Sequence, residues 1–357
     1  MASVPDISAA RNLYGSALAE LGALVASLGE PPYRARQIFR AMYRRDALVP
    51  AGWSDLPAGL RRRLSERHVV RRPWVAGRRD AADGTRKYLL DLPAGGQVEA
   101  VAIPARERWT FCISSQIGCA FGCRFCMTAR LGFTRHLTPG EIVGQVAALR
   151  ADTGAPHGAY NIVFMGMGEP LHNLRGVMGA LEILLHPLGF ALRPRRITVS
   201  TVGLPDRIAR LASLPEPPRL AVSLVTADPA LRRELMPAAR AVRLEDLAAA
   251  IRAYGAGRRD RPTLEVVMLA GVNDGPSHAA ALARFARAAR AKVNLIEFNP
   301  TPELPFRPSP EARVHGFLRS LSRAGVVGTV RRSRGRDIDA ACGQLAFTGA
   351  AAERPAR

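Results

Sequence analysis

Short apolar runs rich in β-branched residues recur along the chain from about residue 98. Each run is long enough for one strand, and from Asn161 onward neighbouring runs are separated by segments long enough to hold a helix. Apolar strands that alternate with helices are typical of a parallel sheet with helical crossovers. We therefore predict an α/β domain built as a full or partial barrel. The predicted strands lie at residues 98–104, 110–115, 161–166, 196–201, 220–225, 264–269, 293–299 and 327–333.

One helix start is well marked after the second of these strands. Thr138 can cap the helix, Pro139 takes its first position, and Glu141 lies three residues after the cap, which is the capping-box pattern. The apolar residues that follow form one stripe: Ile142, Val143, Val146 and Leu149. Three cysteines lie between the strand and this helix, so we place them in a loop. Loops at the carboxyl ends of parallel strands carry the chemistry of α/β enzymes.

The first part of the chain has a different pattern. Residues 1–95 show helical periodicity and arginine runs such as residues 61–63. The segment 32–43 separates apolar from basic positions as an amphipathic helix does, with Ile38, Phe39 and Met42 against Arg34, Arg36 and Arg40. We predict a small basic helical accessory domain at 1–95 that binds RNA, a barrel core at 96–345 and a flexible tail at 346–357. For any single arginine, a solvated helix face is as good an interpretation as an RNA contact.

The charge balance points to a polyanionic partner. The chain of 357 residues has 51 Lys and Arg against 30 Asp and Glu, a formal net charge of +21, and nucleic acid is the obvious candidate. Only Lys87 and Lys292 are lysines; a GC-rich genome would produce that skew, although not the excess over acids. No apolar stretch reaches the roughly 18 residues of a membrane span, and the N-terminus has no secretory pattern, so we expect a cytoplasmic protein without a membrane partner.

The cysteines favour metal chemistry. Five cysteines are an odd number in a chain without a secretory signal, which argues against a disulfide framework. Cys119, Cys123 and Cys126 form a C-x3-C-x2-C motif. A four-iron cluster usually takes four protein thiolates, so three leave one iron open to the amino and carboxylate groups of a substrate. The alternative, a structural zinc site, needs four ligands and usually shows paired C-x2-C motifs, which the sequence does not contain.

Motifs along nearly the whole chain resemble one family. In order and approximate spacing they are similar to those of the dual-specificity 23S rRNA and tRNA adenine-C2 methyltransferases of the radical S-adenosylmethionine (SAM) superfamily. The motifs are FCISSQIGC (111–119), the cysteine motif, GFTR (132–135), NIVFMGMGEP (161–170), STVG (200–203), LEVVML (264–269), GVND (271–274), NLIEFNP (294–300) and RGRDIDAACGQL (334–345). The resemblance implies a radical SAM (β/α)-type partial barrel with a small helical N-terminal accessory domain.

The resemblance also implies cofactors and partners. A [4Fe-4S] cluster is expected on Cys119, Cys123 and Cys126, with two molecules of SAM used per turnover. The expected substrate is 23S rRNA in its peptidyl-transferase region, and whether tRNA is a second substrate stays open. An external, flavodoxin-like electron donor and a monomeric state are expected as well. The sequence leaves the identity of the physiological reductant open.

The two remaining cysteines match the catalytic cysteines of the family. By resemblance, a first SAM methylates Cys342, and a radical made from a second SAM removes hydrogen from that methyl group. The carbon radical then adds to adenine and links the RNA to the protein. Cys112 attacks the sulfur of Cys342 as the link breaks, which ends in a disulfide that needs reduction. Glu99 matches the residue that accepts the C2 proton.

Other motif positions match residues that hold SAM in the family. Gly168 and Glu169 match a G-E-P motif that receives the methionine amino group, with glycine permitting close backbone approach. Val225 departs from the pattern, because the family usually has histidine there; a backbone contact can survive this change, whereas a side-chain contact cannot. The further positions expected to bind the polar groups of SAM are Ser200, Ser223, Leu224 and Asn299.

Three alternatives remain open at this point. The related resistance methylases share the cysteine pattern and methylate C8 of the same base. A paralogue could perform radical chemistry on another substrate, as Val225 hints. The third alternative is a non-catalytic RNA-binding protein in which a structural zinc ion holds the cysteine loop. The basic N-terminal part and the RGRDIDAACGQL end favour C2 methylation.

Overall fold

One large curved sheet organises the molecule. The computed structural model describes residues 10–345, and the tail predicted at 346–357 lies outside them. The parallel strands of the sheet are β6 (Arg108–Cys112), β9 (Tyr160–Phe164), β10 (Ile197–Thr201), β11 (Arg219–Ser223), β12 (Thr263–Met268), β13 (Lys292–Glu297) and β14 (Gly328–Arg331). The antiparallel strands are β3 (Trp74–Asp80), β4 (Arg86–Asp91) and β5 (Gln97–Ala105).

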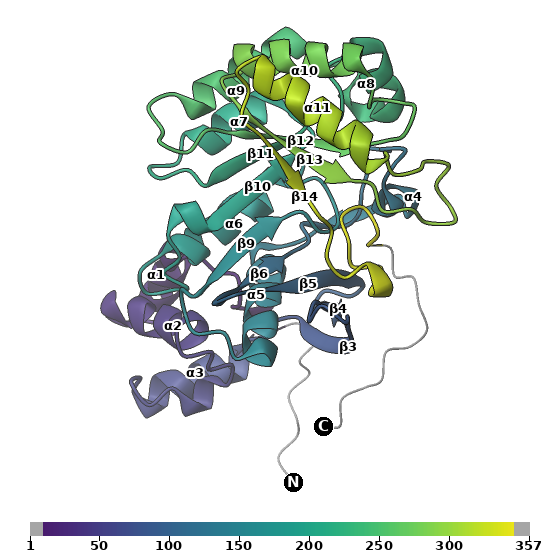
Figure 1. The fold of residues 1–357 in the computed structure, drawn as a ribbon. Helices are drawn as coiled ribbons and strands as arrows, with labels where there is room; N and C mark the ends of the chain where they lie inside the picture. Colours follow the sequence, from purple (N-terminus) through teal and green to yellow (C-terminus); the bar gives the residue numbers. More distant parts are fainter. Residues whose placement is uncertain (1–9, 346–357) are drawn as a thin grey trace.

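The strand order is that of a partial barrel. The sheet runs β14-β13-β12-β11-β10-β9-β6-β5-β4-β3, so β14 and β3 are its edges (Figure 1). Helices connect the parallel strands and cover the outer face, because each crossover must bury its apolar stripe on the sheet. They are α5 (Pro139–Thr153), α6 (Leu174–Leu185), α7 (Pro205–Ala212), α8 (Pro229–Leu235), α9 (Leu244–Gly255), α10 (Pro276–Ala288) and α11 (Glu311–Arg323). The predicted α/β class is confirmed.

The predicted helix start after the cysteines is also confirmed. The backbone N–H of Glu141 donates to Thr138 Oγ1 at 3.2 Å, and the N–H of Thr138 donates to Glu141 Oε2 at 2.9 Å. The segment before it is more ordered than a simple loop. It contains the short helix α4 (Met127–Arg130) and a small hairpin of β7 (Gln116–Gly118) and β8 (Phe133–His136).

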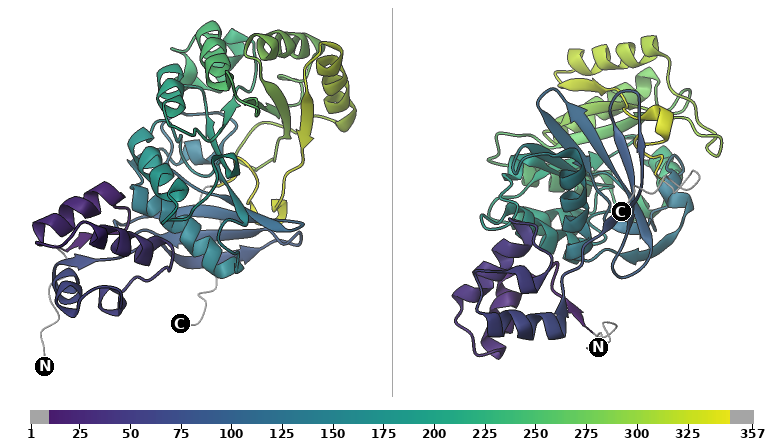
Figure 2. Two further views of the ribbon diagram at one scale, coloured as in Figure 1. Left: turned by 90° about the vertical axis from the view of Figure 1, so that its left-hand side faces the viewer. Right: turned by 90° about the horizontal axis from the view of Figure 1, so that it is seen from below.

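The N-terminal helices pack against the barrel beside α5 and α6 (Figure 2). They are α1 (Leu18–Ser27), α2 (Tyr33–Tyr43) and α3 (Ala58–Arg67), with the short parallel pair β1 (Arg11–Asn12) and β2 (His68–Val69). The amphipathic helix predicted at 32–43 is α2: Ile38, Phe39 and Met42 are fully buried, whereas Arg36 and Arg40 are exposed. The ring of Phe39 lies 4.8 Å from that of His186, just after α6.

The helical pattern does not extend to residue 95 as predicted. Residues 74–80 and 86–91 form β3 and β4, which continue the large sheet beyond β5. The prediction of helix was wrong for this stretch. Pairing decides the structure instead, since β5 would otherwise expose an unpaired row of backbone groups to solvent.

The C-terminal segment crosses from one edge of the sheet to the other. After β14 it passes to the turn between β3 and β4 (Figure 1), where the N–H of Gly335 donates to Asp83 Oδ2 at 3.2 Å and that of Ala82 donates to Asp337 Oδ2 at 2.9 Å. This crossing places residues 339–345 in contact with the cysteine segment. None of the described helices is both long and apolar enough to span a membrane.

Candidate active site

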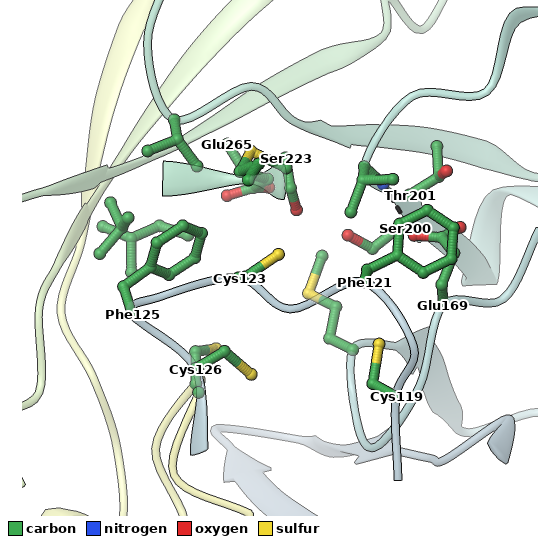
Figure 3. Close-up of a pocket in the computed structure, with 18 of the residues that line it drawn as sticks. Cys119, Phe121, Cys123, Phe125, Cys126, Glu169, Ser200, Thr201, Ser223 and Glu265 are labelled. Atoms are coloured by element: carbon green, nitrogen blue, oxygen red, sulfur yellow. Dashed lines mark hydrogen bonds between the residues drawn. The ribbon is translucent and has the colours of Figure 1, made fainter. Parts of the chain in front are cut away.

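A cavity of about 180 Å³ lies at the carboxyl ends of the parallel strands (Figure 3). Strands β9, β10, β11 and β13 contribute residues at or after their last positions, and β12 contributes Glu265 and Val267, as expected for an α/β enzyme. The cysteine segment and the C-terminal segment complete the wall. Of the predicted site residues, those that line the cavity are Cys119, Cys123, Cys126, Gly168, Glu169, Ser200, Ser223, Val225 and Cys342.

The three cysteines of the motif converge on this cavity from one short segment. The N–H of Cys119 donates to Gly132 O at 2.7 Å, and that of Cys126 donates to Cys123 O at 3.1 Å, so backbone bonds fix the turn. Gly118, with φ 70°, permits the close approach of β7 and β8, because an added Cβ would lie 1.8 Å from Gly132 O. The thiols of this segment face the cavity (Figure 3).

The environment of these thiols suits iron ligation. Burial raises the pKa of Cys119 to about 12 and raises the pKa values of Cys123 and Cys126. A bound cation reverses this effect, because it stabilises the thiolate directly. Among the described residues, no three Cys, His, Asp or Glu side chains are arranged around a single ion. Three thiols spread around a cavity fit a multi-iron cluster, whose irons lie apart from one another.

Glu169 brings a buried carboxylate to the cavity wall. Its oxygens accept the N–H groups of Leu171 at 2.9 Å and Val202 at 2.8 Å. Burial raises the pKa of Glu169 to about 7, although these hydrogen bonds oppose the rise. Gly168 adopts φ 94°, and a Cβ there would lie 2.5 Å from Gln116 Cβ, so only glycine fits. A carboxylate held this firmly can receive an amino group at a defined place.

Only some of the residues predicted to bind the rest of SAM line the cavity. Ser200 and Ser223 line the cavity, whereas the Leu224 side chain is fully buried and its N–H donates to Glu265 O at 3.0 Å. Asn299 lies outside the lining. Its Nδ2 donates to Ser333 Oγ at 2.8 Å, and its buried Oδ1 has no hydrogen-bond partner. Whether Leu224 and Asn299 contact SAM stays a prediction.

Val225 lines the cavity in an unusual backbone conformation. Its φ is 65°, in the left-handed region that β-branched residues rarely adopt. Its carbonyl oxygen accepts the side-chain amide of Asn273 at 2.9 Å, which fixes this geometry. Valine at this position puts an apolar surface against the cavity.

The two remaining cysteines are brought together from distant parts of the chain. Cys112 is buried at the end of β6, and Cys342 lies on the cavity wall. Burial raises the pKa of Cys112 to about 12; the Cys342 thiol adds to the rise, and Arg331 opposes it. Two contacts hold the Cys342 segment on α4: the N–H of Met127 donates to Gly343 O at 2.8 Å and Thr128 Oγ1 donates to Leu345 O at 2.6 Å.

Three charged residues of the site were not predicted from the sequence. Glu265 lies on the cavity wall, Arg331 lies near Cys112 and Cys342, and the Lys87 ammonium lies 2.8 Å from the carboxylate of Glu99. Glu265 and Arg331 are charged positions within predicted apolar strands, which is a usable signal. Lys87 is one of only two lysines in an arginine-rich chain.

Two family models match the chain. The model described as the radical SAM superfamily matches residues 113–283, and the model described as the ribosomal RNA large subunit methyltransferase N-terminal domain matches residues 11–70. A dual-specificity RNA methyltransferase RlmN of Solidesulfovibrio magneticus is 45% identical over 337 residues, which are 94% of this chain and 96% of the relative. The chain belongs to the RlmN family of radical SAM enzymes.

Other relatives agree with this assignment. An RlmN of Syntrophobacter fumaroxidans is 46% identical over 92% of this chain and 96% of its own length. A crystal structure of a radical SAM methyltransferase from Sphaerobacter thermophilus is 42% identical, with a TM-score of 0.87, and the match covers 94% of this chain and 99% of that chain. The predicted fold and cofactors are thereby confirmed: RlmN proteins use a [4Fe-4S] cluster and two molecules of SAM per turnover.

Proposed function

We propose that this protein is an RNA methyltransferase that acts on C2 of adenine in 23S rRNA, with tRNA as a second substrate. One arrangement carries the proposal: a cavity lined by three thiols of one segment and by Cys342, with Cys112 buried nearby. C2 of adenine lies between two ring nitrogens and is electron-poor, so it does not attack a methyl sulfonium as a nucleophile. A radical route is needed, and each part of that route has a candidate residue here.

Cys119, Cys123 and Cys126 would hold the cluster, and Glu169 would receive the amino group of SAM. When bound, the cluster supplies the electron that splits SAM into methionine and a 5′-deoxyadenosyl radical. The chain's own residues hold the sulfonium compound in place and exclude water from it. Gly168 allows the close approach, and Ser200 and Ser223 offer hydroxyl groups at the same wall.

Cys342 and Cys112 would carry the methyl group and release it. The Cys342 thiolate attacks the methyl carbon of a first SAM; the new S–C bond forms as the old one breaks, and its electron pair leaves on the sulfur of S-adenosylhomocysteine. The 5′-deoxyadenosyl radical would remove one hydrogen atom from the S-methyl group, and the resulting carbon radical would add to C2, with loss of the C2 proton to a base and of one electron to the cluster. The Cys112 thiolate then attacks Cys342 sulfur, the S–S bond forms and the S–C bond to the base breaks. The electron pair stays on that carbon, which takes a proton to become a methyl group. Two electrons from an external donor restore the thiols.

The helical N-terminal part would be the RNA-binding accessory unit. We place this unit at residues 11–70 and begin the barrel core at β3, because β3 and β4 belong to the large sheet. Exposed arginines on α2, such as Arg36 and Arg40, suit phosphate contacts. A flavodoxin-like donor, a monomeric state and a cytoplasmic location complete the proposal.

Anaerobic reconstitution tests this function. The protein is loaded with iron and sulfide, then incubated with 23S rRNA, SAM and a reductant, and digested RNA is measured by mass spectrometry. We expect 2-methyladenosine from the wild type, none from Cys342→Ala, and a protein–RNA crosslink that accumulates in Cys112→Ala. A product of 8-methyladenosine would assign C8 chemistry instead. SAM cleavage without methylated adenosine would assign another substrate, and zinc binding without iron uptake would leave only an RNA-binding role.

A further inference from the structure

Glu99 and Lys87 form a buried ion pair near the two catalytic cysteines. Lys87 Nζ lies 2.8 Å from Glu99 Oε1, and both side chains are only 5% exposed. The second oxygen, Glu99 Oε2, is buried and has no hydrogen-bond partner. One oxygen of this carboxylate is therefore held by the ammonium group, and the other is free to accept a proton.

The register of the sheet places this ion pair on the same face as Cys112. Val101 of β5 pairs with Lys87 of β4 on one side and with Cys112 of β6 on the other. Directly paired residues share a face of a sheet, and so do residues two apart on one strand. Glu99 is two residues from Val101, so Glu99, Lys87 and Cys112 face the same side.

Lys87 also contacts the segment that carries Cys342. Its Nζ donates a second hydrogen bond to the carbonyl oxygen of Asp339, at 3.1 Å and three residues before Cys342. Asp339 has φ 53°, and the neighbouring Asp337 carboxylate is tied to the turn between β3 and β4 through the N–H of Ala82. The Lys87 ammonium group thus contacts both Glu99, the predicted proton acceptor, and the segment that carries Cys342, the predicted methyl carrier.

The choice of lysine at this position fits such a role. Nearly all of the 51 basic residues of the chain are arginines, so arginine is the usual cation in this sequence. An ammonium group is compact and can donate to two oxygens in different directions, whereas a guanidinium group is a rigid plane. Burying an ion pair seldom stabilises a fold more than apolar side chains would, so stability alone gives no reason for the pair.

We propose that Lys87 is a positioning residue for the proton transfer of the methylation reaction, an inference that rests on the proposed function. Its ammonium group pairs with Glu99 Oε1 and leaves Oε2 to accept the proton. After the carbon radical has added to C2, the C2–H bond breaks: the proton moves to Glu99 Oε2, the bonding electron pair stays on the purine, and the odd electron of the adduct would pass to a one-electron acceptor, the bound iron–sulfur cluster. Lys87 keeps all its protons throughout.

The first test compares Lys87→Met with Lys292→Met in the reconstituted holoenzyme. Lys292 is the only other lysine and is exposed on β13, which makes it a matched control. We expect Lys87→Met to form 2-methyladenosine about tenfold more slowly at neutral pH. The loss should shrink as pH rises, because a buried carboxyl group without its counter-ion favours the protonated form. Lys292→Met should keep the wild-type rate and pH profile.

A second measurement needs no cluster. In thermal unfolding of the cluster-free protein, Lys87→Met should gain melting temperature relative to the wild type as pH falls, since protonation neutralises the unpaired carboxylate in the folded state. Lys87→Arg keeps the cation and should keep the wild-type pH dependence. If Lys87→Met does not fold, the double variant Glu99→Gln with Lys87→Met replaces it, because both of the new side chains are neutral. This double variant should form 2-methyladenosine at the same rate as Glu99→Gln alone.

The outcomes separate the two proposals. Equal rates and pH profiles for Lys87→Met and Lys292→Met would overturn the positioning role, as would a double variant about tenfold slower than Glu99→Gln alone. If the proposed function fails, the wild type itself forms no 2-methyladenosine. The unfolding measurements still report in that case whether Lys87 holds the charge of Glu99.

Discussion

At the scale of single residues, burial decides which thiols react. Cys112 is buried on β6 and its pKa is raised to about 12, whereas Cys342 is exposed. Only the thiolate attacks an alkylating reagent, so in folded, cluster-free protein we expect iodoacetamide to label Cys112 roughly a thousandfold more slowly than an ordinary thiol at the same pH. The labelling rate of Cys112 should rise about tenfold per pH unit until the pH approaches its pKa. Peptide mass spectrometry measures both sites.

Two controls accompany the labelling experiment. Urea-unfolded protein should react at Cys112 as fast as at Cys342, because unfolding removes the burial that raises the pKa. The variant Cys342→Ser removes the nearby thiol and should leave Cys112 slow, since burial is the larger cause. Fast labelling of Cys112 in the folded wild type would contradict the account.

At the scale of elements, α5 joins the N-terminal helices to the barrel through a close backbone contact. A Cβ on Gly140, in the first turn of α5, would lie 2.2 Å from Tyr14 O. We expect Gly140→Ala to lower the free energy of unfolding by about 1–3 kcal/mol, because the backbone of residues 14 and 15 would have to move. Urea unfolding of the cluster-free protein measures the change.

Gly59 in α3 is the matched control for this substitution. It is also a helical glycine, but an added Cβ would meet no atom within 4 Å. Gly59→Ala should raise the free energy of unfolding by about 0.5–1 kcal/mol, since alanine loses less backbone entropy in a helix. Equal effects at the two positions would show that the contact between Tyr14 and α5 is not tight.

At the scale of the whole molecule, the excess of positive charge sets the salt dependence of RNA binding. If α2 contacts phosphates, Arg36→Glu with Arg40→Glu should weaken binding of an rRNA fragment and reduce the slope of log affinity against log salt by roughly 1–2. The control pair is Arg313→Glu with Arg319→Glu, which changes charge equally on exposed positions of α11. Filter binding at several salt concentrations measures both.

The control pair separates a local contact from a general charge effect. A general effect would shift both double variants by the same amount, because their net charge is the same. A local contact on α2 would change the slope only in the first pair. Equal slopes for both pairs and the wild type would remove α2 from the RNA interface.

The sequence alone determined the features that depend on neighbours along the chain. The C-x3-C-x2-C spacing identified the cluster segment, the capping box at Thr138 identified the start of α5, and the apolar runs from residue 110 onward identified the parallel strands, whereas the run at 98–104 is the antiparallel strand β5. These signals are local, because a short stretch of chain fixes the geometry that each one encodes. Family motifs then supplied the identity of the cofactors.

Tertiary structure decided what depends on residues far apart in the chain. The C-terminal segment crosses the sheet and contacts the cysteine loop, which places Cys342 beside the cavity. The register of the strands places Lys87, Glu99 and Cys112 on one face of the sheet. The strands β3 and β4 were missed for the same reason, since their place in the sheet depends on pairing with β5 and with each other. A pattern within one segment records its own periodicity; it does not record which distant segment will pair with it.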